Sequence, residues 1–236
     1  MYPQLLYLYV LSIRWLTYAQ TAEAPDACST AYDYNLASGF AAKWYAYPQY
    51  SDDGSWNMDY TSSDYMSLGY AAACSYHQQS GITDLNVQTP WPSDDVGYGD
   101  YFYGYNTTYT NLTIEFTGLY LAAQTGNYTF EFTSSDDSAV MFIGSSAYDC
   151  SDCTAYAVST KRDIVSRTNL PLYSRSTEKY LVNGIDSSAG SGTASLEGGA
   201  FYAVRIVYTN GHLAGSLGFQ VTLPDGTIST DFTFSI

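Results

Sequence analysis

Two adjacent carboxylates, Asp136 and Asp137, lie in the short polar run Ser134–Ser138. Segment 127–133 before them alternates polar and apolar residues, and segment 139–143 after them is apolar. Carboxylate oxygens are the ligands that hard cations prefer, and calcium takes about six to eight oxygens in proteins. A cation held on a surface loop can offer its remaining coordination positions to sugar hydroxyls. The pair therefore predicts a metal site, and a protein that binds rather than catalyses.

An aspartate pair alone is a weak signal in so acidic a chain. Asp52-Asp53 and Asp94-Asp95 repeat the motif, and in polar loops such residues usually start turns. We therefore interpret these two pairs as solvated turn residues, and the interpretation of Asp136 and Asp137 depends on the elements around them.

Those elements are predicted to be strands. Apolar residues at every second position mark a strand with one buried face, and sequences such as Gln124–Asn127, Asn210-Gly211 and Pro224–Thr227 are typical of turns between strands. Many short strands separated by turns favour an all-β fold, an antiparallel β-sandwich or a closed barrel. The alternating segments are 112–117, 128–133, 202–208 and 217–223, followed by Phe232, Phe234 and Ile236, and residues 139–143 form a short apolar run.

Two regions lack this pattern and are predicted to form long surface loops, with irregular strands as well in the first of them. Residues 45–105 are rich in Asp, Ser, Gly and Tyr, and residues 186–193 in Ser and Gly. We expect Trp44, Trp56 and Trp91 to lie in the core, because large aromatic side chains are mostly buried.

The composition excludes some partners. The chain has 236 residues, a formal net charge of −15, a pI near 4.1 and 26 tyrosines. This length suits one large β domain, and the acidity would repel phosphate backbones, which makes nucleic acid a poor partner.

The N-terminus resembles a secretory signal. Residues 5–13 form an apolar run too short to span a bilayer, and small residues follow at Ala19, Ala22 and Ala24. Cleavage after any of the three is open, and an N-terminal strand is the alternative. We assign residues 1–22 to the signal and residues 23–236 to the domain.

Cysteines and glycosylation sequons also favour secretion. The four cysteines lack nearby histidines at zinc-ligand spacing, so disulfides are predicted, with three possible pairings. Sequons begin at Asn106, Asn111 and Asn127 and are glycosylation acceptors only in a secreted chain. The cysteines are Cys28, Cys74, Cys150 and Cys153.

Two blocks carry a family resemblance. The sequence FTGLYLAAQTGNYTFEFTSSDDSAV (116–140) and the sequence AFYAVRIVYTNGHLAGSLGFQVTLPDGT (200–227) resemble the PA14-type ligand domain of yeast flocculins and epithelial adhesins, in the same order and at similar spacing. The resemblance implies a PA14-type β-sandwich lectin in which a calcium ion, held between two loops, coordinates a terminal hexose.

The resemblance also implies the site residues. Asp136 and Asp137 would be joined by a cis peptide, Asn210 would supply an amide oxygen, and His212 and Ala214 would supply backbone carbonyls. These five oxygens leave about two positions for sugar hydroxyls. From its sequence alone, Asn210 before Gly211 would be a hairpin turn residue. The residues implied to contact sugar are Asp136, Asp137, Tyr148, Asn210, Gly211, His212 and Leu213.

Cysteine pairing is likewise implied only by the resemblance. Either Cys150 or Cys153 would bridge to Cys28, and Cys74 would pair with the remaining one.

The resemblance thus implies a fungal adhesin domain that requires Ca²⁺ and binds terminal mannose-, galactose- or N-acetylglucosamine-type hexoses at cell surfaces or walls. Weak single sites would act in many copies, without membrane insertion. A secreted glycosidase is the first alternative, but its two acids should flank the scissile bond, which sequence neighbours do poorly. A structural wall protein is the second.

Overall fold

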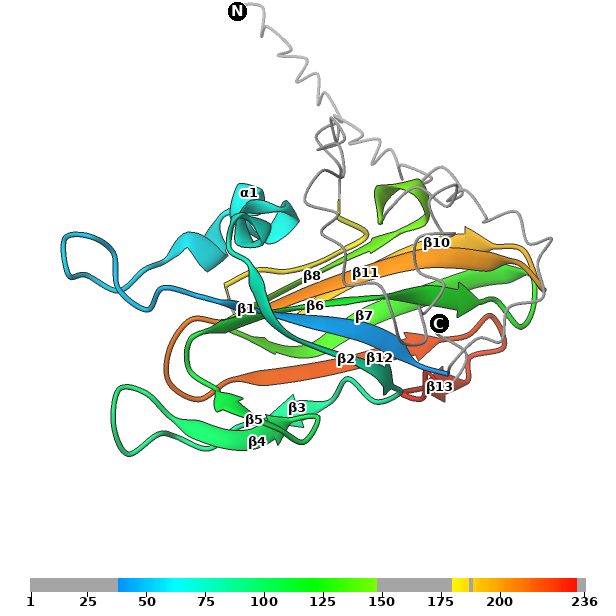
Figure 1. Ribbon diagram of the computed structural model, residues 1–236. Coiled ribbons are helices and arrows are strands. Elements are labelled where there is room, and N and C mark those ends of the chain that lie inside the picture. Colours follow the sequence, from blue (N-terminus) through cyan, green and yellow to red (C-terminus); the bar gives the residue numbers. More distant parts are fainter. Residues whose placement is uncertain (1–37, 148–179, 187–188, 233–236) are drawn as a thin grey trace, which may run out of the picture.

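The computed structural model describes residues 38–147, 180–186 and 189–232 (Figure 1). The predicted signal, Tyr148, Cys28, Cys150, Cys153 and the last strand residues Phe234 and Ile236 lie outside these ranges. Within them, the chain forms two antiparallel sheets packed as a sandwich, as predicted, together with a separate hairpin.

The larger sheet has six strands, and the register of its centre is regular. In order across the sheet these are β2 (Ser75–Ile82), β1 (Phe40–Ala46), β6 (Leu112–Leu121), β11 (Phe201–Asn210), β8 (Ser138–Ile143) and β9 (Val182–Gly184). The long central strand β11 pairs with β6 from Phe201↔Leu121 to Asn210↔Leu112 without a register shift.

The smaller sheet has five strands. Its order is β10 (Gly190–Leu196), β7 (Gly126–Asp136), β12 (Ser216–Thr222) and β13 (Ile228–Ser229), with β3 (Val87–Gln88) pairing with β12. Strands β4 (Tyr98–Phe102) and β5 (Tyr105–Thr108) form the separate hairpin.

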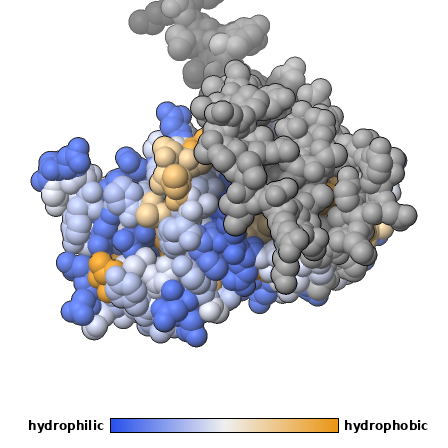
Figure 2. All heavy atoms as spheres, viewed as in Figure 1, coloured by the Kyte–Doolittle hydropathy of each residue, from blue (hydrophilic) through white to orange (hydrophobic). Residues whose placement is uncertain are grey.

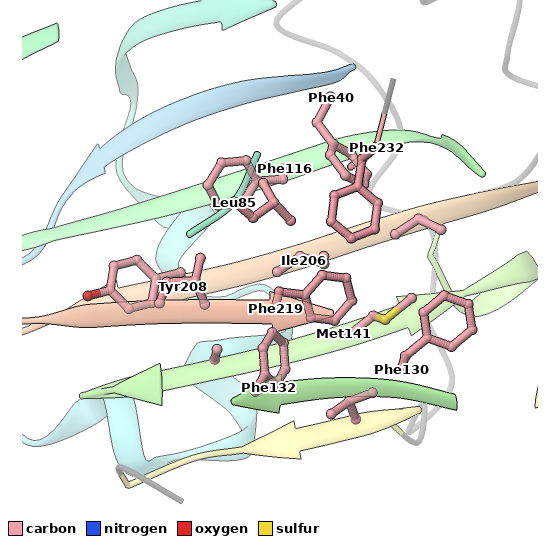
Figure 3. Close-up of a cluster of buried hydrophobic side chains, with 14 of the residues drawn as sticks. Phe40, Leu85, Phe116, Phe130, Phe132, Met141, Ile206, Tyr208, Phe219 and Phe232 are labelled. Carbon is pink, nitrogen blue, oxygen red and sulfur yellow. The ribbon is translucent and has the colours of Figure 1, made fainter. Parts of the chain in front are cut away.

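The main core lies between the sheets, built from the alternating residues that the sequence singles out (Figure 3). Phe130, Phe132 and Phe219 enter from the smaller sheet, and Phe116 and Ile206 from the larger one, all at most 1% exposed. Burial of side chains of this size is a main source of stability in a sandwich.

The outer face of the larger sheet is also buried, and here the expectation of half-buried strands is wrong. Three short helical segments, η1 (Asp59–Thr61), α1 (Ser63–Ser67) and η2 (Gly69–Ala72), cover it. They build a second core in which Met66 and Tyr70 pack with Val207 of β11. Because helices cover this face, β6 and β11 are almost entirely buried on both sides.

A buried charge joins these two layers. Arg205 of β11 is 2% exposed, with its guanidinium 3.8 Å above the ring of Phe142. It donates hydrogen bonds to the carbonyls of Ser67 (2.6 Å) and of Ala147, which follows η3 (Gly144–Ser146) (3.1 Å). The arginine therefore belongs to the second core.

Two expectations for the loops need correction. Only Trp44 of the three tryptophans predicted in the core is buried, whereas Trp56 and Trp91 are 40% and 73% exposed. The predicted loop 186–193 becomes strand at Gly190, where β10 begins to pair with β7. Within the described residues, no helix is long and apolar enough to cross a membrane.

The pairing brings the predicted site residues to one end of the sandwich. Strand β7 ends at Asp136 and β8 begins at Ser138, while β11 ends at Asn210 and the chain returns as β12 at Ser216. Ser216 pairs with Asp136, so the β7–β8 corner and the β11–β12 loop are neighbours. The β11–β12 loop is at the left end of the sandwich in Figure 1.

Candidate metal-binding site

The Asp136–Asp137 peptide bond is cis, as the family resemblance implies. Both residues are fixed to the end of β11. The hydroxyl of Tyr208 donates a 2.7 Å hydrogen bond to the carbonyl of Asp136, and the N–H of Asp137 donates one of 3.2 Å to the carbonyl of Thr209. The position of the pair is therefore set by the strand that leads into the second loop.

The carboxylate of Asp137 joins the two loops directly. Its Oδ2 accepts hydrogen bonds from the backbone N–H groups of Gly211 (2.8 Å) and His212 (3.3 Å). Nδ1 of His212 lies 3.5 Å from the same oxygen. The residue is only 8% exposed, and the other carboxylate oxygen takes part in none of these three contacts.

Asn210 is fully buried and has one unsatisfied atom. Its Nδ2 donates hydrogen bonds to the carbonyls of Tyr109 and Leu213, the second at 3.3 Å. Its Oδ1 is buried and has no hydrogen-bond partner. A buried acceptor without a partner is costly, so this oxygen is well suited to coordinate a cation.

Gly215 lets the loop pack closely around Asn210. A Cβ at this position would lie 2.5 Å from both Nδ2 of Asn210 and the hydroxyl oxygen of Tyr208, closer than atoms can approach. The N–H of Gly215 donates a 2.8 Å hydrogen bond to the hydroxyl of Thr89, which fixes the position of the glycine. The loop also contains Leu213 in the left-handed region, at φ 62°.

The electrostatics of the site favour the binding of a cation. Burial, together with the smaller effect of the Asp136 charge, raises the pKa of Asp137 to about 7, although the N–H groups of Gly211 and His212 act in the opposite direction. Burial lowers the pKa of His212. Because a nearby positive charge favours the ionised carboxylate, a bound cation would reverse the penalty on Asp137.

The residues present fit an oxygen-liganded cation such as calcium. The set offers two carboxylates and the unpaired amide oxygen of Asn210, with His212 and Ala214 on the same loop as sources of backbone carbonyls. These are hard oxygen donors of the kind that calcium takes. In the part of the chain that the structure describes, no group of three or more His, Cys, Asp or Glu side chains forms a metal cluster.

Aromatic side chains that the sequence did not predict at the site lie beside the β11–β12 loop. The rings of Trp56 and Tyr60 lie 4.5 and 5.4 Å from that of His212, both edge-on, and Tyr50 stacks on Trp56 at 5.0 Å. The turn-like sequence between Tyr50 and Trp56, Ser-Asp-Asp-Gly-Ser, is a signal that could have predicted a hairpin presenting both rings. Tyr148, the aromatic residue predicted to contact sugar, lies outside the described residues.

Cys74 and the three sequon asparagines are the predicted modification sites that lie within the described residues. Cys74 is exposed, and its three possible partners lie outside the described residues, so the pairing stays a prediction. Asn106 and Asn127 are exposed, whereas the amide oxygen of Asn111 is buried. Exposure suits glycosylation better at the first two positions.

The fold is that of PA14-type sugar-binding and adhesin domains. The structure aligns with the epithelial adhesin 6 A domain of Candida glabrata, solved in complex with Galβ1-3GlcNAc, at a TM-score of 0.69, 20% identity and coverage of 91% of this chain and 92% of that one. The PA14 sugar-binding domain of an RTX adhesin aligns at a TM-score of 0.51 and 15% identity, over 85% of this chain and 98% of that one.

Sequence comparison identifies the family to which the domain belongs. Residues 112–223 match the GLEYA domain. Flocculation protein FLO9 of Saccharomyces cerevisiae is 31% identical over 212 residues, a match covering 73% of this chain and 15% of that protein; flocculation protein FLO1 is 30% identical, with 73% and 13% covered. The chain thus carries a PA14/GLEYA-type adhesin domain related to the yeast flocculins and the Candida glabrata epithelial adhesins, relatives that are adhesins and not enzymes. It spans about 15% of the length of these flocculation proteins.

Proposed function

We propose that this chain is a calcium-dependent lectin domain that binds terminal hexoses of surface glycans and mediates adhesion between cells or to surfaces. The observation that carries the proposal is the unpaired, buried Oδ1 of Asn210, on the loop whose N–H groups bind Asp137. An orphaned acceptor and a buried carboxylate on adjoining loops are the features expected of a calcium site.

The site residues would have separate roles. Asp136, Asp137 and Asn210 would hold the ion through side-chain oxygens, and His212 and Ala214 through backbone carbonyls. Bound calcium would supply open coordination positions for two neighbouring sugar hydroxyls. Tyr208 and Thr209 keep the carboxylates in position through the hydrogen bonds to the backbone of the pair.

The loop from Gly211 to Ala214 would select the sugar. A calcium ion binds a hydroxyl pair in any of several hexoses, so discrimination must come from neighbouring side chains. His212 and Leu213 are partly exposed at this position. Galactose-containing disaccharides are the first ligands to test, because the structural relatives include an epithelial adhesin solved with Galβ1-3GlcNAc, and mannose- and N-acetylglucosamine-type sugars come next.

The predicted setting is the outside of a fungal cell. Residues 1–22 as a secretory signal, residues 23–236 as the lectin domain and the relation to flocculation proteins all support display at the cell wall. Sites of low individual affinity would then act through many copies.

A glycan array probed with calcium and with a chelator tests the proposal. We expect binding to glycans with terminal hexoses in calcium, loss of binding in chelator, and recovery when calcium is restored. Binding that survives chelation would contradict the calcium role, and release of free sugar from a bound glycan would favour a glycosidase. The absence of any bound glycan in calcium would favour a structural protein.

A further inference from the structure

Two aromatic side chains, Tyr50 and Trp56, form a stacked and exposed pair beside the candidate metal site. Their ring centroids lie 5.0 Å apart with planes inclined by 24°, and the residues are 44% and 40% exposed. Single apolar side chains scattered over a surface need no explanation, but grouped ones commonly mark a binding site.

The backbone holds this pair in place. Tyr50 and Trp56 are partners in an isolated antiparallel bridge, flanked by backbone hydrogen bonds of 3.0 and 2.8 Å on its two sides. Directly opposed residues of this kind bring their side chains together on one face. At the base of the hairpin, the buried hydroxyl of Tyr47 donates a 2.7 Å hydrogen bond to the carbonyl of Asn57. The two rings are therefore presented by a fixed hairpin.

A second loop braces the pair from the side. The hydroxyl of Tyr50 donates a 3.1 Å hydrogen bond to Oδ2 of Asp95, and Nε2 of Gln49 donates one of 2.7 Å to the carbonyl of Asp95. Contacts to two segments reduce the side-chain freedom that would be lost on binding.

His212 connects the pair to the site. Its ring lies edge-on to that of Trp56, with centroids 4.5 Å apart, and its Nδ1 lies 3.5 Å from Oδ2 of Asp137. One side chain therefore separates the aromatic pair from the carboxylate. A ligand of more than one sugar residue, bound at the carboxylate, would extend over the neighbouring surface.

We propose that Tyr50 and Trp56 form a stacking platform for the sugar residue next to the terminal hexose. The inference rests on the proposed function, because it requires a terminal hexose at the metal. A pyranose ring has apolar C–H faces that pack on an aromatic surface, and its hydroxyls remain in water. Sugars of this kind are uncharged, so the acidic surface does not repel them.

Trp91 is the competing candidate. It is 73% exposed. It lies two residues after Thr89, whose hydroxyl accepts a hydrogen bond from the N–H of Gly215 in the β11–β12 loop. It therefore also lies near the site and must be compared with Trp56 directly.

Isothermal titration in saturating calcium tests the platform. The probes are Galβ1-3GlcNAc and mannobiose, each paired with the methyl glycoside of its terminal sugar. The variants are Trp56→Ala, the conservative Trp56→Phe and Trp91→Ala. The control is Ile228→Ala, which removes an exposed side chain (59%) from β13, where Ile228 pairs with Thr222 at the end of β12 remote from Ser216.

We expect Trp56→Ala to weaken disaccharide binding about tenfold, as the loss of one good aromatic contact would. The methyl glycoside and calcium dissociation constants should stay within about twofold of the wild-type values, as should all constants of Ile228→Ala. Trp56→Phe should lose less disaccharide affinity than Trp56→Ala. If the alanine variant fails to fold, the phenylalanine variant tests the proposal in its place.

Three results would overturn the platform alone, and a fourth would overturn the proposed function as well. Equal losses for disaccharide and methyl glycoside would mean that Trp56 supports the whole site, and an effect of Trp91→Ala alone would place the contact elsewhere. If the wild type binds both classes but all variants match it, the platform is wrong while the proposed function stands. If the wild type binds none of the four probes and no glycan on the array, both fail.

Discussion

The backbone N–H of Gly211 donates a 2.8 Å hydrogen bond to Oδ2 of Asp137. This bond connects the β7–β8 corner to the β11–β12 loop, so segments far apart in the sequence form one structural unit. A change that displaces either end of this bond should therefore alter metal binding.

Asp137→Asn should weaken calcium binding by at least tenfold. The substitution removes a charged oxygen ligand but keeps an oxygen that can accept hydrogen bonds from Gly211 and His212, so the fold should persist. Calcium titration by calorimetry measures the effect. Asp94→Asn, in an exposed aspartate pair, is the matched control and should leave the affinity unchanged. Wild-type affinity in folded Asp137→Asn protein would exclude Asp137 as a ligand.

Asn210→Ala should affect both stability and metal binding. It leaves the carbonyls of Tyr109 and Leu213 without their donor, which should lower the free energy of unfolding in chelator by about 1–3 kcal/mol. Added calcium should stabilise the wild type, since a ligand that binds only the folded state raises its stability, but should stabilise this variant far less. Urea unfolding with and without calcium measures both effects.

The control is Asn106→Ala, at an exposed position on β5, which should leave both quantities unchanged. A full calcium-induced stabilisation of Asn210→Ala would contradict the role given to its Oδ1.

The sequence predicted the strands of the sandwich better than the layers around them. Strands β6, β7, β11 and β12 follow from the alternation of large apolar residues such as Phe130 and Phe132, and β8 follows from a short apolar run. One face of each of these strands packs on the main core. The burial of Arg205 could not be predicted, nor that of Glu115, whose carboxylate accepts a hydrogen bond from the hydroxyl of Tyr70 in η2, because both depend on short helical segments whose pattern is too brief to recognise. Polar strands such as β2 carry no alternation of this kind.

In the candidate site, too, one part could be predicted from the sequence and another could not. The convergence of Asp137 with residues 210–212 was predicted from the resemblance of two sequence blocks. The contact of Trp56 with His212 was not, because it joins a hairpin in a region without pattern to a distant loop. Local sequence predicts neither the distance nor the exposure of such a pair.

Gly215→Ala should weaken calcium binding without removing any ligand. The added Cβ would meet Asn210 and the hydroxyl of Tyr208 at 2.5 Å, so the amide must move away from its present position. We expect at least a tenfold rise in the calcium dissociation constant, measured by calorimetry. The neighbouring substitution Ser216→Ala adds no atoms and should have little effect, and equal affinities in the two variants would show that the loop tolerates the displacement.

The stability of the chelated protein should fall as pH rises from about 4 to about 7. The folded-state pKa of Asp137, about 7, exceeds its ordinary value of 3.8, so in this window the unfolded state has lost the proton that the folded state keeps. Stability then decreases with pH, by about 4 kcal/mol at most for a shift of this size. Below this window both states are protonated and the penalty is absent.

Urea unfolding across this pH range in chelator measures the slope. Asp137→Asn should remove this part of the slope, and saturating calcium should reduce it, because the ion stabilises the ionised carboxylate. A slope that is the same in wild type and Asp137→Asn would mean that other groups cause the pH dependence.

Leu213→Asn should change which sugars bind while leaving calcium binding intact. Leu213 is 37% exposed and has a φ of 62°, a conformation that asparagine adopts more readily than leucine, so the loop should keep its shape. The new amide offers hydrogen bonds to sugar hydroxyls where leucine offers an apolar contact. A glycan array should therefore show a different order of preferred terminal hexoses, with the calcium dissociation constant within about threefold of wild type. An unchanged order of preference would argue that residues outside the β11–β12 loop select the sugar, and a loss of calcium binding would assign Leu213 a structural role instead.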